Sequence, residues 1–496
     1  MKTFIKGTFF LMIVIFLSKL LGFIFRMQFV RIAGEEAVGY YQASYPTFIF
    51  FISVVQFGLP IAISKFVAEY FVKSKKTIPS IMRTVYKFTF FSSAIMLPIL
   101  IICVPFIAKT LLHNEDLKPL LYVAMLTIPF VVFSSIFKAY LQGLMKITST
   151  AFAQLLEQVC RIGLVFLFLP LYADASPVKL ATIVMIFTFI SEGVSFVVLY
   201  FSYLRNRMQE DKARSYPLTP LLKTALPAQG SKLFGTFTWF LEPIVFLKAL
   251  TTTGLTVAAA TTIYGLISGV HIPLLLFPSF IPNALAIVLI PAISESIAKR
   301  NYASVQKRTQ VSMRICSLTG AFACTVFFLY GDEMAMELFH IGESHYMKIL
   351  APIFYFYYIQ SPMHAILQAS GEAKAAMMNS IYGGISKLFI MFVLASQPAL
   401  QEKGAIIAIG FGVVMTSVLH IATLKKLEAF KLSIRPFVGP YFIFMIVSAI
   451  FSFFPLNLTL MPQILVTLLV LTATSFLFKQ LTLNEINMLI SRLRAL

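Results

Sequence analysis

The feature that most constrains this chain is a succession of apolar segments, each about twenty residues long. A helix needs roughly 20 apolar residues to cross the hydrocarbon core of a bilayer. By that rule the sequence predicts fourteen transmembrane helices, with approximate centres at residues 19, 52, 95, 131, 161, 191, 234, 275, 319, 358, 388, 414, 446 and 471. The connections between them are too short to fold as soluble domains. We therefore expect an all-α polytopic membrane protein.

The distribution of charge predicts how the helices are oriented in the membrane. A formal net charge of +20 would suit a nucleic-acid-binding protein, but 59% of the residues are hydrophobic and the bases are dispersed among apolar runs. Lys and Arg concentrate in alternate connections, for example at Lys73, Lys75 and Lys76, and at both termini. Because cytoplasmic loops are enriched in Lys and Arg, both termini are expected to be cytoplasmic. Nucleic acid is not an expected partner.

Two cations interrupt the first apolar segment. Lys19 and Arg26 are seven residues apart, so they project from nearly the same helix face, about 10 Å apart along the axis. A charge at bilayer depth costs a few kcal/mol or more unless it faces a polar interior. The pair therefore favours a water-filled, anion-attracting cavity over contact with lipid.

Short motifs that occur twice in the sequence indicate an internal repeat. The motif Ser-Lys-Leu-Leu-Gly at residues 18–22 recurs as Ser-Lys-Leu-Phe-Gly at 231–235. A second motif, Leu-Pro-Ile-Ala-Ile-Ser at 59–64, recurs as Ile-Pro-Ala-Ile-Ser at 290–294. Two parallel-related six-helix bundles would place an axis along the membrane normal and a cleft between them. The predicted domains are an amino-terminal six-helix bundle (1–204), a cytoplasmic linker (205–218), a carboxy-terminal six-helix bundle (219–426), and two extra transmembrane helices with a cytoplasmic tail (427–496).

The cleft is predicted to bind an anion. Lys19, Arg26 and Lys232, the lysine of the 231–235 motif, would line it, and phosphate or pyrophosphate is the large anion that Arg and Lys most often recognise. His271 is a further candidate for the lining, although a hydrogen-bonded core histidine is the simpler interpretation. The uncharged last two helices could guide an acyl or isoprenoid chain, and plain exposure to lipid would explain them equally well.

A deep carboxylate offers a route to ion coupling. Glu242 would be protonated or would hold a cation at that depth, so it is a candidate for coupling to H⁺ or Na⁺, together with Asn379 and Thr416. An ion pair with Lys232 or Arg26 is the alternative. No other cofactor and no metal site are expected.

A second pair of charges is interpreted as structural. Glu157 and Arg161 are spaced i, i+4 with the acid first, which is a favourable helical ion pair. The sequence has no Walker motif, nucleophile elbow or zinc-protease helix, so an enzyme is not expected. A membrane glycosyltransferase or ligase of lipid-linked sugars is the enzyme class that remains as an alternative.

The amino-terminal 22–69 stretch resembles a known family. It contains Gly-Glu-Glu at 34–36, Gly-Tyr-Tyr at 39–41 and Gly-Leu-Pro-Ile-Ala-Ile-Ser-Lys-Phe-Val-Ala-Glu at 58–69. These residues are similar to the stage V sporulation protein B and polysaccharide transporter family of the MOP (MATE-like) flippase superfamily, which is related to the lipid II flippases. The lipid II flippases carry arginine where Lys19 stands and an acid where Met27 stands, and arginine rather than His271 in the eighth helix.

The resemblance implies a fold and an activity. The expected activity is a flippase that moves an undecaprenyl-pyrophosphate-linked saccharide, such as lipid II or a related cell-envelope or spore-cortex precursor, across the bacterial cytoplasmic membrane by alternating access. The implied partners are the lipid-linked oligosaccharide, membrane lipid and cell-wall synthesis enzymes. A cation-coupled multidrug or organic-ion exporter of the same fold is the alternative.

Overall fold

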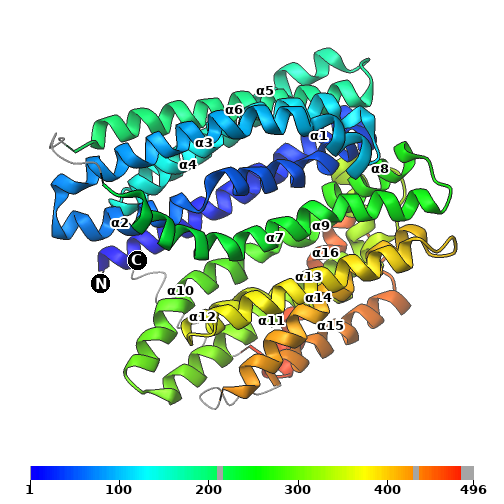
Figure 1. The fold of residues 1–496 in the computed structure, drawn as a ribbon. Helices are drawn as coiled ribbons and strands as arrows, with labels where there is room; N and C mark the ends of the chain where they lie inside the picture. The colour runs from blue at the N-terminus through cyan, green and yellow to red at the C-terminus, as the bar shows by residue number, and fades with distance from the viewer. Residues whose placement is uncertain (1, 209–215, 428–434, 482–496) are drawn as a thin grey trace. The chain divides into compact units, whose positions relative to one another are not determined.

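The computed structural model describes residues 2–208, 216–427 and 435–481 of the chain (Figure 1). Residues 209–215 of the predicted linker and 482–496 of the predicted tail therefore lie outside the described residues, as do residues 1 and 428–434. Every regular element in the described ranges is helical. The prediction of an all-α protein is confirmed.

The helices cover almost the whole of the described chain. The α-helices are α1 (Lys2–Gln56), α2 (Leu59–Lys73), α3 (Ile78–Phe106), α4 (Lys118–Gly143), α5 (Ile147–Phe168), α6 (Pro177–Asn206), α7 (Leu218–Thr252), α8 (Val257–Gly265), α9 (Ile272–Leu276), α10 (Phe280–Ala298), α11 (Tyr302–Phe339), α12 (Tyr346–Ala369), α13 (Ala373–Ala395), α14 (Gln401–Lys426), α15 (Arg435–Phe453) and α16 (Leu460–Leu477). Short 3₁₀ or π turns join some of them: η1 (Lys75–Thr77), η2 (Ile107–Leu111), η3 (Glu115–Leu117), η4 (Leu169–Tyr172), η5 (Leu266–His271) and η6 (Phe277–Ser279).

Local sequence explains where several helices begin. The Ser176 hydroxyl accepts a hydrogen bond from the Lys179 amide, and Pro177 fills the first position of α6, where no amide hydrogen is needed. Asn301 caps α11 in the same way by accepting from the Ser304 amide at 3.0 Å. These caps satisfy donors that would otherwise be unpaired at a helix end.

Helix α1 is two helices joined at a glycine. Gly34 has φ 79° and ψ 171°, a backbone conformation that residues with a Cβ rarely adopt. A second break follows at Gly58, where φ is 71°, and the helix axis bends by 46° between the stretches Phe16–Gln56 and Leu59–Lys73. The first two predicted spans, centred at residues 19 and 52, therefore lie on either side of the Gly34 break.

The number of membrane spans differs from the expected fourteen. Among the described residues, eleven helices are long and apolar enough to cross a membrane, or twelve if the bent pair counts as one span. The expected count is thus not confirmed. The two places where the counts diverge are α1, which Gly34 divides, and α12, which has 24 residues but is not one of the eleven.

The chain packs as two compact units. The amino-terminal unit is Leu20–Gly269, and the carboxy-terminal unit combines Met1–Lys19 with Val270–Leu496. In this division α7 belongs to the amino-terminal unit, where it packs against α2 and α8. The predicted bundles, 1–204 and 219–426, stay a prediction.

Each unit has its own apolar core. In the amino-terminal unit, α4 packs against α2, α3 and α6, and Ile63, Ile81 and Tyr140 are almost fully buried between them. In the carboxy-terminal unit, α12 packs against α10, α11 and α14 around Met363 and Ile366.

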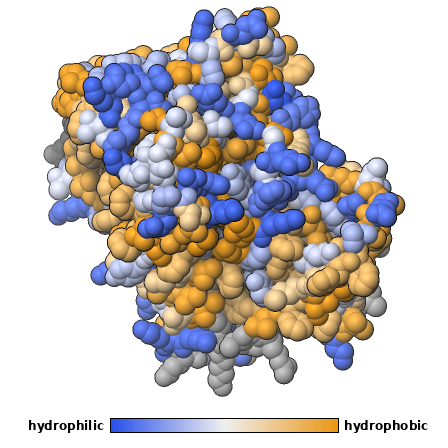
Figure 2. Space-filling model, turned by 90° about the vertical axis from the view of Figure 1, so that its right-hand side faces the viewer, coloured by the Kyte–Doolittle hydropathy of each residue, from blue (hydrophilic) through white to orange (hydrophobic). Residues whose placement is uncertain are grey.

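Many apolar side chains are exposed on the outer surface. Leu465 and Leu469 of α16 are 61% and 70% exposed, and only 17% of the apolar window of that helix is buried. Figure 2 shows broad hydrophobic areas among hydrophilic clusters on one face. Such a surface is stable against lipid rather than water, which agrees with a multi-pass membrane protein.

A close helix crossing holds the amino-terminal unit together. A Cβ atom built at Gly39 of α1 would overlap the main chain of Thr261 in α8, and one built at Gly265 would overlap Gly39. Small residues of this kind let helix backbones approach directly inside membranes.

We predict that Gly39→Ala destabilises the protein by about 1–3 kcal/mol, because the added methyl group overpacks the α1–α8 crossing. The thermal unfolding midpoint of the purified chain should fall. Gly163→Ala in α5 is the matched control, since nothing lies within 4 Å of a Cβ at that position. Equal midpoints for the two variants would contradict the assignment.

Candidate functional site

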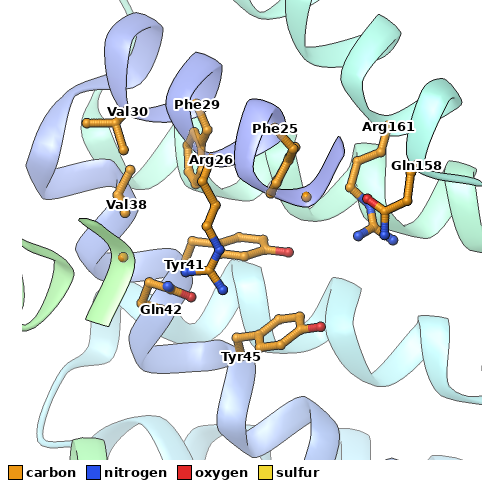
Figure 3. A pocket seen from close by; sticks show the side chains of 12 residues that line it. Phe25, Arg26, Phe29, Val30, Val38, Tyr41, Gln42, Tyr45, Gln158 and Arg161 are labelled. Atoms are coloured by element: carbon orange, nitrogen blue, oxygen red, sulfur yellow. The ribbon is translucent and has the colours of Figure 1, made fainter. Parts of the chain in front are cut away.

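A polar cavity of about 160 Å³ lies inside the amino-terminal unit (Figure 3). Its polar lining comes from the two halves of α1 and from α5, and Phe25 and Phe29 form an apolar wall. The polar lining residues are Arg26, Tyr41, Gln42, Tyr45, Gln158 and Arg161. We call this cavity the Arg26 pocket.

The break at Gly34 brings the lining residues of α1 together. Arg26 precedes the break and Gln42 and Tyr45 follow it, and Figure 3 shows the Arg26 side chain extending toward Tyr41, Gln42 and Tyr45. The rings of Tyr41 and Tyr45 stack with their centroids 5.7 Å apart. The bend thus turns residues that are distant along α1 into neighbours.

A backbone carbonyl anchors the Arg26 side of the pocket. The Arg26 guanidinium donates to the carbonyl oxygen of Ser268 at 3.3 Å, and the Gln42 amide donates to the same oxygen at 2.9 Å. Ser268 lies in the π-helical turn η5. Turns of this kind interrupt the regular α-helical bonding pattern and recur at functional sites.

Arg161 is held by two carboxylates. Its guanidinium lies 2.8 Å from Glu157 and 3.5 Å from Glu192, donates through Nε to the Ser191 hydroxyl at 3.1 Å, and is only 8% exposed. Its charged end also lies over the Phe25 ring, 5.8 Å from the centroid. Burial away from water makes each of these carboxylates a strong partner for the cation.

The two arginines therefore differ in charge balance. Arg161 is compensated by two acids, whereas no carboxylate of the described residues forms an ion pair with Arg26. Among the described residues, the buried side-chain oxygen of Gln158 also has no hydrogen-bond partner. The pocket thus offers one uncompensated cation to an anion and one acceptor to a hydroxyl group.

The other predicted cations have neutral hydrogen-bond partners. The Lys19 ammonium donates to the Ser279 hydroxyl at 3.0 Å within the carboxy-terminal unit. The Lys232 ammonium donates to the Gln56 side chain at 3.2 Å within the amino-terminal unit, and Lys232 does not line the Arg26 pocket.

His271 is a core residue of the carboxy-terminal unit. It is fully buried, shares a hydrogen bond of 2.8 Å with the Ser344 hydroxyl, and packs edge-on against Tyr346 with the ring centroids 5.1 Å apart. This is the arrangement expected of a hydrogen-bonded core histidine. Its role toward substrate stays a prediction.

The predicted ion-coupling residues are buried in separate surroundings. Glu242 is 7% exposed in α7 of the amino-terminal unit, with Tyr264 as an electrostatic neighbour. In the carboxy-terminal unit, the Asn379 amide contacts the His420 ring at 3.1 Å and donates to the Thr423 hydroxyl at 2.9 Å. The Thr416 hydroxyl donates to the Gly412 carbonyl at 2.8 Å.

Several residues of the Arg26 pocket were not identified from the sequence. The Glu157–Arg161 pair was expected from its spacing, but its second acid, Glu192, and its contribution to a pocket with Arg26 were not. Gln42 and Gln158 were missed as well. The sequence does contain a signal for both: each is an amide inside an apolar segment, where burying a polar side chain costs free energy.

Comparison with curated proteins identifies relatives over most of the chain. Residues 4–297 match the family model for polysaccharide biosynthesis proteins. The chain is 34% identical to stage V sporulation protein B of Bacillus subtilis (strain 168), over 91% of this chain and 89% of that protein. Sporulation protein YkvU of the same organism is 30% identical over 88% of this chain and 97% of its own length. Lipid II flippase MurJ of that organism is 22% identical over 85% of this chain and 82% of its own.

Solved structures show the same fold at low identity. A structure of the lipid II flippase MurJ in an inward closed conformation aligns with 97% of this chain and 99% of its own, with a TM-score of 0.68 and 15% identity. An inward-facing multidrug resistance MATE family transporter of the MOP superfamily aligns with 83% of this chain and 96% of its own, with a TM-score of 0.65 and 16% identity. The similar proteins whose names state an activity are transporters and flippases, not enzymes.

The charge balance around Arg161 makes a prediction about stability. Arg161→Met should destabilise the protein by about 3 kcal/mol, because it leaves two partly buried carboxylates without their cation. The triple variant with Glu157→Gln and Glu192→Gln added should recover most of that loss. The readout is the thermal unfolding midpoint of the purified chain, and failure of the added substitutions to restore it would refute the pairing.

Proposed function

The chain belongs to the polysaccharide biosynthesis protein family, and from this membership and the charges of the Arg26 pocket we propose that it is a flippase for an undecaprenyl-pyrophosphate-linked saccharide. The cargo would be lipid II or a related cell-envelope or spore-cortex precursor. It would cross the bacterial cytoplasmic membrane by alternating access. Two relatives are named as sporulation proteins and one as a lipid II flippase, which supports a role in envelope synthesis.

The observation that carries this proposal is the uncompensated charge of Arg26. A guanidinium removed from water is stable only with a counter-charge or with hydrogen-bond acceptors, and among the described residues its acceptor is one carbonyl. A pyrophosphate oxygen would supply the missing charge in a charge-assisted hydrogen bond. A cationic drug would instead be repelled from this position.

The rest of the pocket, at about 160 Å³, suits a small part of the head of that molecule, such as one phosphate or one sugar hydroxyl. The unpaired oxygen of Gln158 can accept from a sugar or water hydroxyl, and the stacked Tyr41 and Tyr45 rings offer an amphipathic surface beside it. The rings of Phe25 and Phe29 pack against Tyr41 and exclude water from that part of the lining, which strengthens electrostatic attraction inside the pocket.

Lys19, Lys232 and His271 are proposed as further substrate contacts. Neither lysine forms an ion pair with a described residue, since their partners are the neutral side chains of Ser279 and Gln56. Both therefore keep a charge that a diphosphate could use in one of the conformations of the transport cycle. For His271 the supporting observation is weaker, because its ring is already bonded to Ser344.

The tail of the cargo would remain in apolar surroundings. Helices α15 and α16 expose large apolar side chains, including Phe442 at 56% and Leu469 at 70%. We propose that they face lipid and guide the isoprenoid chain. The loop cations favour cytoplasmic termini, and enzymes of cell-wall synthesis would deliver or consume the cargo.

Ion coupling is proposed to run through Glu242. Its side chain is 7% exposed in a membrane helix, where a carboxylate is stable only when protonated or paired with a cation. The proposed driving ion is H⁺ or Na⁺, with Asn379 and Thr416 as further polar groups of the cycle. A multidrug exporter of the same fold is the second candidate function, favoured by the MATE likeness.

We predict that Arg26→Gln lowers lipid II flipping in proteoliposomes by about tenfold or more, because a charge-assisted hydrogen bond is lost. Arg26→Lys should retain part of the rate. Lys65→Gln, which removes an exposed cation of α2, is the control and should flip normally. Undiminished flipping by Arg26→Gln would defeat the site, and transport of a cationic dye without any lipid II flipping would favour the exporter.

We predict that Glu242→Gln abolishes the dependence of flipping on an imposed H⁺ or Na⁺ gradient, because the neutral amide has no titrating or ion-binding oxygen pair. Glu295→Gln is the matched control, since it removes an exposed carboxylate paired with Lys299. Flipping rates would be measured in proteoliposomes with and without each gradient. An unchanged gradient dependence in Glu242→Gln would exclude this residue as the coupling group.

A further inference from the structure

A second and larger cavity lies inside the carboxy-terminal unit, between α10 and α12. It has a volume of about 450 Å³, and α13 and α14 each contribute one residue to it, Ser380 and His420. Ligand pockets commonly measure roughly 300–1,000 Å³, a range that includes this cavity but not the Arg26 pocket. We call it the α10–α12 groove.

Helix α12 presents a polar stripe to the groove. Its lining residues are Tyr357, Gln360, Ser361, His364 and Gln368, together with Ala365. The polar members are separated by three, four or seven residues, so they project from one helix face. This stripe helps to explain why α12 is not among the helices that are apolar enough to cross a membrane.

Helix α10 forms an apolar wall with one polar residue. Ala286, Ile287 and Ile290 line the groove on this side, and Asn283 is the polar residue among them. The groove therefore has one wall that can form hydrogen bonds and one that can pack against carbon.

Three polar side chains of the groove are available to a ligand. In the part of the chain that the structure describes, the side chains of Asn283, Tyr357 and Ser361 form no hydrogen bond. Together they supply one amide and two hydroxyl groups, which can both donate and accept.

The other polar side chains are held in place by their neighbours. The Gln360 amide nitrogen donates to the Val413 carbonyl at 2.7 Å and to the Ser417 hydroxyl at 3.1 Å, both in α14. The His420 ring is 1% exposed, and its centroid lies 5.7 Å from that of His364. Side chains that are already fixed lose little freedom when a ligand binds.

The chemistry of the lining restricts the occupant. Among the described residues that form the groove, none is Asp, Glu, Lys or Arg. A cation or an anion would therefore find no counter-charge, and a hydrocarbon chain would leave the polar stripe without partners. A neutral sugar has hydroxyl groups for the α12 stripe and ring carbons that can pack against Ile287 and Ile290.

We propose that the α10–α12 groove binds the uncharged sugar rings of the lipid-linked cargo. This inference rests on the proposed function, which supplies the saccharide. It divides recognition of the cargo between two places: Arg26 meets the diphosphate, and the α10–α12 groove meets the sugar.

The test is native mass spectrometry of the full chain in detergent, titrated with undecaprenyl-pyrophosphate-linked N-acetylglucosamine or with undecaprenyl pyrophosphate, which lacks the sugar. The unaltered chain should bind the sugar-bearing lipid at least about tenfold more tightly. The variant Asn283→Ala, Tyr357→Phe, Ser361→Ala should lose most of that preference, because each neutral hydrogen bond contributes about two- to tenfold. Its Kd for undecaprenyl pyrophosphate should not change.

A matched control separates this site from a general loss of polar groups. Tyr382→Phe, Ser452→Ala, Asn457→Ala removes the same kinds of group from exposed positions of the same unit, and it should keep the preference. If the groove variant does not fold, Tyr357→Phe alone carries the test, with an expected loss of about threefold.

A second comparison distinguishes this inference from the proposed function. Arg26→Gln should weaken both lipids by the same factor, because both carry the diphosphate. Failure of the unaltered chain to bind either lipid would overturn the proposed function and this inference together.

Three results would overturn this inference alone. The first is equal binding of the two lipids by the unaltered chain, which would show that the sugar is not recognised. The second is an undiminished preference in the groove variant. The third is the same loss of preference in the groove and control variants.

Discussion

The ion pairs of Arg161 with Glu157 and Glu192 are the interaction on which the amino-terminal unit depends. They allow three charged side chains to lie together away from water, because each charge has a partner. Arg26, on the other side of the same pocket, has a carbonyl instead. The contrast separates a charge that holds helices together from one that is available to a substrate.

Patterns that are local in sequence could be predicted well. The Glu157–Arg161 pair follows from four residues of spacing in one helix, and the helical, membrane-spanning character of the chain follows from its apolar runs. The family was identified from motifs within residues 22–69, and the match to residues 4–297 confirms it. In each case the information is contained in one continuous stretch of the sequence.

Features that depend on tertiary packing could not be predicted. Glu192 reaches Arg161 across 31 residues, and the Ser268 carbonyl reaches Arg26 across 242, so no spacing rule connects them. The assignment of α7 to the same unit as α2 is likewise a result of packing and not of sequence order. Hydropathy separated two spans centred at residues 19 and 52, but it did not locate the break between them at Gly34.

The π-helical turn η5 makes this region sensitive to the insertion or loss of a single residue. A π turn accommodates about one residue more than an α turn, so side chains beyond it are rotated by roughly 100° relative to an uninterrupted helix. Residues before and after η5 therefore follow two different phases of the helical repeat. Loss of one residue between Leu266 and His271 would restore a single phase and displace the Ser268 carbonyl from Arg26 and Gln42.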